Sequence, residues 1–512
     1  MPGLPLYSLR DLWNNTVDKY PRKTAVIFAE EEHTYAECDA LSARVAAHLQ
    51  SDLGVQKGDR VSFLLSNCFE FYLGYWAAVR LGAVVAPVNI RLSEEEMGYV
   101  LRCLSPRVLL VHAEHQAAAE AALRGVEPRP ALVSVGYETA DAVPFPRLLT
   151  GEGKFTPPDI LPEDLAVIAH TSGTTGLPKG AMMRHTDLLF NLKNTIIPFG
   201  FRHEDVHLLV VPLFHATGLY SLVPSSCYLG STLVMAPRPD PREVVELIAK
   251  HRITTFLSVP TFFYFVTHLP DLERYDLRCL RVIGYAGSPM PVQTIRRLHQ
   301  KFPWARLHNF FGLTETISLT HIMPAPNALT HAESIGKVIP DVGAKIFRED
   351  GTEAEVGEVG RLHIHRSAVI QGYWNRPGLL EESLTPDGEW FDTGDLARED
   401  EEGFVYLHGR TKEMIIVAGE NVFALEVERT ILEHPRVREV AVVGVPATGV
   451  RAYLGELVKA VVVPQEGANL TPLEIKRFCA QRLASYKVPQ IVEFRPALPR
   501  NPSGKVLKRE LQ

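Results

Sequence analysis

The most constraining feature of the chain is a short stretch rich in glycine, threonine and serine, from Thr171 to Gly180. It lies between two apolar runs, residues 165–169 and 181–183, which are typical of buried strands. Glycines let the backbone curl, so that successive N–H groups can point toward one anion, while the hydroxyl groups and Lys179 add further donors and a positive charge. The sequence therefore predicts a phosphate-binding loop that connects two strands.

This loop differs from the common P-loop of nucleotide-binding proteins. The P-loop motif needs a lysine directly after its second glycine and a helix directly behind it. Here Leu177 and Pro178 precede Lys179, and the apolar strand follows. Backbone and hydroxyl groups must then bind phosphate without a helix N-terminus. A flexible linker is the plain alternative, but linkers seldom follow a buried strand directly.

Length and charge set further bounds. A chain of 512 residues is too long for one ordinary hydrophobic core, so we expect at least two domains. Its net charge of −7 gives no support for nucleic-acid binding. Six cysteines without a C-x-x-C pair indicate reduced thiols and no structural zinc site. The N-terminus lacks a basic region followed by an apolar core, so no signal peptide is expected and the cytoplasm is the predicted location.

Residues 208–237 contain no Asp, Glu, Lys or Arg, which raises the alternative of a membrane span. Prolines, glycines and polar residues interrupt the stretch, among them Pro212, His215 and Pro224. We therefore expect it to divide into strand, loop, helix and strand, with no membrane span in the chain.

The order of predicted elements indicates an α/β fold. Helices alternate with strands along the first part of the chain, as in the helices 9–20, 35–50 and 93–101 and the strands 25–28, 61–65 and 107–111. We expect a large N-terminal domain of several subdomains over residues 1–409. Residues 410–512 are predicted to form a small, mobile α+β domain, with strands 414–417, 437–445, 457–463 and 491–494 and helices 425–433 and 472–484.

Several motifs resemble those of the adenylate-forming enzymes, a superfamily of acyl-CoA synthetases, peptide-synthetase adenylation domains and luciferases. The loop of residues 170–180 is similar to the signature of that superfamily, and residues 308–316, 390–396, 409–414 and 498–509 match its later motifs in the same order. The resemblance covers almost the whole chain and is nearest to fatty or aryl acid–CoA ligases.

The resemblance implies a nucleotide site. It assigns Lys505, Glu315, Thr314 and Lys179 to catalysis, with Thr314 on the α-phosphate and Glu315 on Mg²⁺, a hard cation that suits a carboxylate. The residues implied to bind ATP are Thr171, Ser172, Gly173, Thr174, Thr175, Gly176 and Lys179 at the phosphates, Ala286, Gly287, Ser288, Asn309 and Phe311 at the base, and Asp395 and Arg410 at the ribose. Phe311 stands where tyrosine is usual, so it can stack on adenine but cannot donate a hydrogen bond from a phenol.

The resemblance also implies an acyl pocket lined by His215, Tyr285, Phe310 and Gly312, with Tyr220 as a further candidate. Amino-acid-activating relatives carry an aspartate where this chain has His215, so an α-amino acid substrate is not expected. Acetate-specific relatives block the pocket with tryptophan at the position of Gly312, which indicates an acid longer than acetate. Lys412 corresponds to the hinge of the small domain, and Gly419 to the loop that enters for thioester formation.

The implied activity is that of an AMP-forming acid–thiol ligase. A carboxylate and ATP give an acyl-adenylate and pyrophosphate, and coenzyme A then gives acyl-CoA and AMP. We expect an apolar medium-chain, longer-chain or aromatic monocarboxylate, with Mg²⁺ as cofactor, no nucleic-acid partner and a homodimer as one arrangement open to the chain. The alternatives are a stand-alone adenylation enzyme that loads a separate carrier protein, a luciferase-like oxygenase, and a nucleotide-binding regulatory protein that has lost activity.

Overall fold

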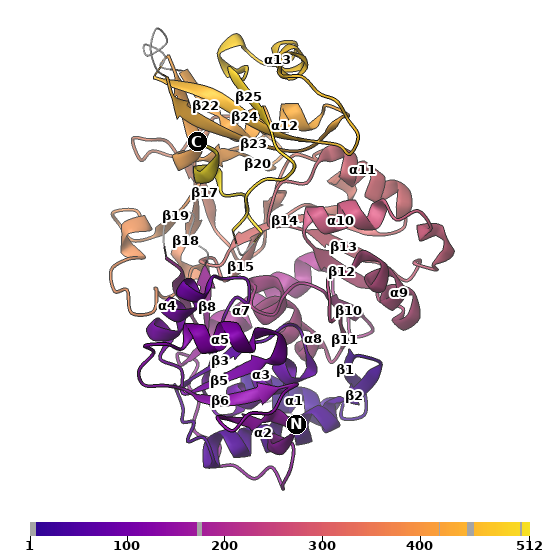
Figure 1. Ribbon diagram of the computed structural model, residues 1–512, viewed down its shortest axis with the longest axis vertical. Helices are drawn as coiled ribbons and strands as arrows, with labels where there is room; N and C mark the ends of the chain where they lie inside the picture. Colours follow the sequence, from indigo (N-terminus) through magenta and orange to yellow (C-terminus); the bar gives the residue numbers. More distant parts are fainter. Residues whose placement is uncertain (1–6, 172–176, 419, 448–454, 502–503) are drawn as a thin grey trace. The chain divides into compact units, whose positions relative to one another are not determined.

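The computed structural model describes residues 7–171, 177–418, 420–447, 455–501 and 504–512 (Figure 1). The chain divides into two compact units. Unit 1 contains residues 1–332, 338–343 and 366–384, and unit 2 contains residues 333–337, 344–365 and 385–512. Both units combine helices with sheets, which confirms the predicted α/β class.

Unit 1 contains a seven-stranded sheet with the order β7-β6-β5-β3-β4-β8-β9. Its strands run parallel except for β9, which is antiparallel to β8. The strands are β3 (Arg60–Leu64), β4 (Val84–Pro87), β5 (Val108–His112), β6 (Ala131–Val135), β7 (Ala142–Pro144), β8 (Leu165–Thr171) and β9 (Lys179–Arg184). The helices along this part of the chain are α1 (Leu9–Lys19), α2 (Tyr35–Ser51), α3 (Phe69–Arg80), α4 (Glu94–Leu104), α5 (Gln116–Ala122) and α6 (Phe145–Leu148).

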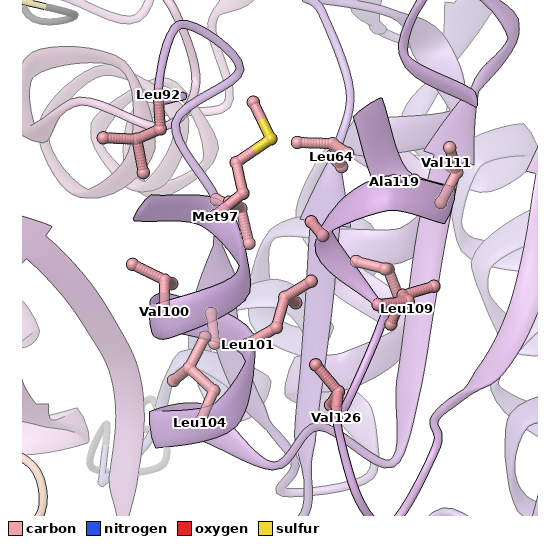
Figure 2. Close-up of a cluster of buried hydrophobic side chains, with 14 of the residues drawn as sticks. Leu64, Leu92, Met97, Val100, Leu101, Leu104, Leu109, Val111, Ala119 and Val126 are labelled. Carbon is pink, nitrogen blue, oxygen red and sulfur yellow. The ribbon is translucent and has the colours of Figure 1, made fainter. Parts of the chain in front are cut away.

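One hydrophobic cluster shows how helices cover this sheet. Figure 2 shows Met97, Leu101 and Leu104 of α4 beside Leu109 and Val111 of β5, and all of them are buried. Helix α4 begins with a capping box, in which the Ser93 hydroxyl accepts a hydrogen bond from the Glu96 N–H and the Glu96 carboxylate accepts one from the Ser93 N–H. Local capping thus sets where the helix begins, and its apolar face sets how it packs.

The nine-stranded sheet has the order β16-β15-β14-β13-β12-β10-β11-β1-β2. Its strands are β1 (Thr24–Phe28), β2 (Glu31–Thr34), β10 (Val206–Leu209), β11 (Thr232–Met235), β12 (Thr255–Ser258), β13 (Val282–Tyr285), β14 (Arg306–Leu313), β15 (Ser318–Ile322) and β16 (Lys337–Val338). The accompanying helices are α7 (His185–Phe199), α8 (Val223–Leu229), α9 (Pro241–His251), α10 (Pro260–Thr267) and α11 (Val292–Lys301). The N-terminal strand β1 joins this sheet by pairing in parallel with β11.

The charge-free stretch divides as predicted. Strand β10, a π-helical turn at Thr217–Leu222, helix α8 and strand β11 follow one another across residues 206–235. Over the part of the chain that the structure describes, no helix has the length and hydropathy needed to cross a membrane.

The described residues of unit 2 form the sheets β17-β18-β19-β20, β21-β22 and β23-β24-β25. The strands are β17 (Ala344–Phe347), β18 (Gly360–His365), β19 (Trp390–Glu399), β20 (Val405–Arg410), β21 (Met414–Val417), β22 (Glu420–Phe423), β23 (Val437–Pro446), β24 (Glu456–Pro464) and β25 (Ile491–Phe494), with helices α12 (Ala424–Leu432) and α13 (Pro472–Ala480). The helix expected over 472–484 therefore ends earlier, and the chain leaves it through a tighter turn in which the Arg482 N–H donates to the Cys479 carbonyl three residues before it.

In the structure the β17–β20 sheet belongs to the same compact unit as the residues after 410. The domain division predicted from the sequence places this sheet in the large domain of residues 1–409. The boundary at residues 409 and 410 and the hinge at Lys412 stay predictions.

Candidate active site

The phosphate loop connects two strands, as predicted. Strands β8 and β9 pair antiparallel, with Thr171 opposite Lys179 and His170 opposite Gly180. The loop therefore starts and ends at adjacent backbone positions, and no helix follows it directly. The predicted phosphate ligands Ser172, Gly173, Thr174, Thr175 and Gly176 lie outside the described residues.

Lys179 and Glu315 both contact the side chain of one tyrosine, Tyr373, which is not among the predicted site residues. The Tyr373 hydroxyl donates a hydrogen bond of 3.0 Å to Glu315 Oε1. Lys179 Nζ lies 5.2 Å from the centre of the Tyr373 ring, a cation–π distance. Burial raises the pKa of the Tyr373 phenol, and the negative charge of Glu315 raises it further. Nothing in the local sequence pattern of residues 372–375 indicates contact with Glu315.

The predicted base-binding and acyl-binding residues follow neighbouring strands of the nine-stranded sheet. Strands β10, β12, β13 and β14 are parallel, with Tyr285 opposite both Ser258 and Asn309. His215 follows β10, residues 286–288 follow β13, and Phe310 lies where β14 runs on past Asn309. The carboxyl ends of parallel strands are a common ligand-binding edge in α/β proteins. The structure thus brings these segments to one edge of one sheet.

Several details of this edge concern the acyl pocket. The Phe310 ring packs edge-on against Phe199, with ring centres 5.3 Å apart. Gly284 leaves room for this packing, because a Cβ there would lie 3.1 Å from Phe199 Cε1 and 3.3 Å from Phe310 Cε1. Tyr285 is buried and Gly312 is exposed. The assignment of these residues to an acyl pocket stays a prediction.

Tyr220 lies in the buried π-helical turn, and burial raises the pKa of its phenol, with the negative charge of Glu315 as the second cause. The side chain of Tyr220 is therefore within electrostatic reach of Glu315. π-Helical turns are rare and are frequent at functional sites. Tyr220 is therefore a candidate neighbour of the predicted metal ligand Glu315 as well as of the acyl pocket that the sequence predicts.

Unit 2 brings together the predicted ribose ligands and the predicted catalytic lysine. Asp395 and Arg410 are opposite each other on β19 and β20, and Arg410 Nε donates to Asp395 Oδ1 at 3.1 Å. Asp395 is 5 % exposed, and among the described residues its Oδ2 accepts no hydrogen bond. Burial raises the pKa of this carboxyl, while the positive charges of Arg410 and Lys505 oppose the rise. A buried oxygen without a partner next to two cations suits a hydroxyl-bearing ligand.

The remaining predicted residues also belong to unit 2. Lys412 lies in a 3₁₀ turn at Thr411–Glu413, and Gly419 falls outside the described residues, between the paired positions Val417 and Glu420. The exposed Lys505 follows a turn in which its backbone N–H donates to Asn501 Oδ1 at 2.8 Å. Beyond it, Lys508 Nζ forms ion pairs with Glu413 Oε2 at 2.7 Å and Glu428 Oε1 at 2.8 Å.

Comparison with known proteins decides the family. The model of the AMP-binding enzyme family matches residues 13–374, and that of the AMP-binding enzyme C-terminal domain matches residues 426–505. The chain belongs to the AMP-binding enzyme family. This membership confirms the resemblance that the motifs indicate.

Relatives within this family of AMP-binding enzymes cover nearly the whole chain. A long-chain-fatty-acid–CoA ligase of Bacillus subtilis is 32% identical over 99% of this chain and 94% of its own. The structure of an anthranilate CoA ligase in complex with anthranoyl-AMP has a TM-score of 0.90 at 26% identity and covers 99% of this chain and 97% of its own. An O-succinylbenzoate coenzyme A synthetase of Bacillus subtilis, in complex with ATP and magnesium ion, has a TM-score of 0.85 at 27% identity and covers 98% of each chain.

The side chains around Glu315 fit a magnesium ion that is held mainly by a nucleotide. Within the described ranges, no group of three or more His, Cys, Asp or Glu side chains is arranged to hold a metal. Mg²⁺ commonly takes one or two protein carboxylates together with substrate phosphates and water. A single carboxylate beside Lys179, at the base of the phosphate loop, is consistent with that mode of binding.

Proposed function

We propose that this AMP-binding enzyme is an ATP-dependent acid–CoA ligase that forms an acyl-adenylate. The observation that carries the proposal is the convergence of Lys179 and Glu315 on Tyr373, which places a cation and a metal-type carboxylate at the base of the phosphate loop. The pairing of Asp395 with Arg410 supplies a second polar site that suits a ribose.

In the first half-reaction, the substrate carboxylate attacks the α-phosphorus of ATP and pyrophosphate leaves. No general base is needed, because a carboxylic acid is already ionised at neutral pH. The transition state is stabilised by positioning and charge. Lys179 and the phosphate loop hold the β- and γ-phosphates, Thr314 binds the α-phosphate, and Lys505 neutralises the developing charge. Glu315 would hold Mg²⁺, which would supply Lewis-acid stabilisation of the charge that develops on the phosphate oxygens.

In the second half-reaction, a thiolate attacks the acyl carbonyl and AMP leaves. Lys505 withdraws and Gly419 enters, which requires a rotation of residues 410–512 at Lys412. Coenzyme A is the proposed thiol, in line with the CoA ligases that match nearly the whole chain. The main alternative is a stand-alone adenylation enzyme that loads a separate carrier protein.

The proposed acid is an apolar monocarboxylate longer than acetate, either an alkyl chain or an aromatic acid. Phe310, Tyr285 and His215 would form the pocket, and none of these side chains offers the guanidinium that a dicarboxylate would bind. Both fatty-acid and aryl-acid ligases are among the relatives. We place the reaction in the cytoplasm.

Acid-dependent exchange between ATP and pyrophosphate tests the proposal. A panel of acids from acetate to long-chain and aromatic monocarboxylates should give exchange with some members and little with acetate. The matched variant Lys505→Ala should lose exchange yet still form thioester from supplied acyl-adenylate, which excludes a contaminating enzyme. If no acid supported exchange, the proposed acyl-adenylate-forming activity would be refuted. AMP release that responds to a carrier protein but not to coenzyme A would favour the alternative.

A further inference from the structure

The segment around Tyr373 is fixed to the exit strand of the phosphate loop by backbone hydrogen bonds. The Trp374 N–H donates to the Gly180 carbonyl at 2.7 Å, and the Met182 N–H donates to the Gly372 carbonyl at 3.0 Å. These bonds place Tyr373 opposite Ala181 in an isolated antiparallel bridge. The segment is therefore aligned with β9 as a short extra strand would be.

The same segment also holds the backbone of Glu315. The Ile370 N–H donates to the Glu315 carbonyl at 2.9 Å. Glu315 lies in the turn between β14 and β15, in a different sheet from β9. Residues 370–374 thus connect the carboxylate of one sheet to the phosphate loop of the other, and both belong to unit 1.

The Tyr373 side chain completes this connection. Its ring is buried, with 7 % of the residue exposed, so the hydroxyl has little access to water as an alternative partner. The hydroxyl donates to Glu315 Oε1, and the ring face lies next to the Lys179 ammonium. A hydrogen bond to Oε1 restricts the rotation of the Glu315 carboxylate and so fixes the direction in which Oε2 points.

We propose that Tyr373 is a positioning residue that orients the Glu315 carboxylate toward the metal–nucleotide complex and keeps Lys179 beside it. The inference rests on the proposed function. Partners of metal-ligating side chains fix ligand orientation, and their loss typically costs about 10- to 100-fold in metal affinity or activity. Tyr373 would act through Glu315 and Lys179, without itself contacting the reacting atoms.

The variant Tyr373→Phe isolates the hydroxyl, because it keeps the ring, the contact with Lys179 and every backbone bond of the segment. The expected result is an approximately 10-fold weaker binding of Mn²⁺ in the presence of ATP, measured on the full chain by the electron paramagnetic resonance of free Mn²⁺. The affinity for AMP without metal should stay within about twofold of the parent chain. A purely structural role would weaken both.

The matched control is Tyr99→Phe. The Tyr99 hydroxyl accepts a hydrogen bond of 2.8 Å from Arg376 Nη2, and Arg376 lies just after residues 370–374 in the sequence. This variant therefore also removes a tyrosine hydroxyl and its hydrogen bond. Y99F should bind Mn²⁺ and ATP like the parent. In the double variant with Glu315→Gln, the loss of Mn²⁺ binding should equal that of E315Q alone, because Tyr373 acts through the carboxylate.

Mn²⁺ binding by Y373F equal to that of the parent, an equal loss in Y99F, or additive losses in the double variant would each overturn the inference. If Y373F does not fold, Tyr373→Leu serves instead, since it also removes the hydroxyl donor and keeps an apolar side chain, and it should weaken Mn²⁺ binding by at least as much. The Mn²⁺ measurement needs no acid substrate. Failure of acid-dependent exchange therefore refutes the proposed function separately from the role of Tyr373.

Discussion

Replacing Asp395 with asparagine should change stability and nucleotide affinity in opposite directions. The carboxyl is buried, its pKa is raised by burial, and only Oδ1 has a partner among the described residues. A raised pKa means that the folded chain holds the charge less favourably than the unfolded chain. This cost sets in as the pH rises above the unfolded pKa and persists at neutral pH. Asp395→Asn removes the charge, so the free energy of unfolding at pH 7.5 should increase.

Binding of AMP should weaken in the same variant. If Asp395 accepts from both ribose hydroxyls, two charge-assisted bonds become neutral ones. Charged hydrogen bonds contribute about 1.5–3 kcal/mol and neutral ones about 0.5–1.5 kcal/mol. The loss is therefore about 1 to 1.5 kcal/mol for each bond, or about 2 to 3 kcal/mol in all, which corresponds to an approximately 30- to 150-fold higher Kd.

Isothermal titration with AMP and urea unfolding at pH 7.5 measure the two effects on the same preparation. Asp392→Asn is the control, because Asp392 lies on the same strand and pairs with Arg361 at 2.9 Å near the surface. D392N should leave the affinity for AMP within about twofold. An AMP affinity of D395N close to that of the parent, or a loss of stability without ligand, would refute the reasoning about the buried carboxylate.

Two further predictions concern stability. Burial lowers the pKa of His321 to about 3, so the folded chain keeps it neutral while the unfolded chain takes up a proton below about pH 6.5. Through this residue the free energy of unfolding of the parent should therefore fall by about 2 kcal/mol at pH 5. The difference in free energy of unfolding between the parent and His321→Gln, measured by guanidinium unfolding, should change by that amount between pH 7.5 and pH 5. If the free energies of unfolding of the parent and of His321→Gln changed in parallel with pH, the effect would be contradicted. The control is H299Q, at an exposed position. Lys508→Met should destabilise the chain by about 3 kcal/mol in the same assay, since it leaves the mostly buried Glu428 without its cation. Adding Glu428→Gln should restore part of this loss, and no recovery would mean that packing dominates.

Much of the local structure follows from the sequence. The apolar runs on either side of the glycine-rich loop predicted β8 and β9, and the strands 414–417 and 491–494 agree with the structure at both ends. Apolar periodicity and caps act within a few residues, so the chain carries these signals locally. The sequence does not predict where α13 ends, because the tighter turn at Arg482 contains no proline or glycine to mark it.

The sequence by itself determined the α/β class and the family, and it predicts the chemistry of the phosphate loop, because these depend on residue types and their order along the chain. Only the tertiary structure decided which distant segments meet. Strand β1 precedes the first sheet in sequence but pairs with β11 in the other, and Tyr373 reaches Glu315 through bonds to β9. Such pairings depend on which apolar faces and backbone groups are satisfied together in three dimensions. The same physical reason brings Lys179 and Glu315 to the same tyrosine, Tyr373, although they lie far apart in the sequence.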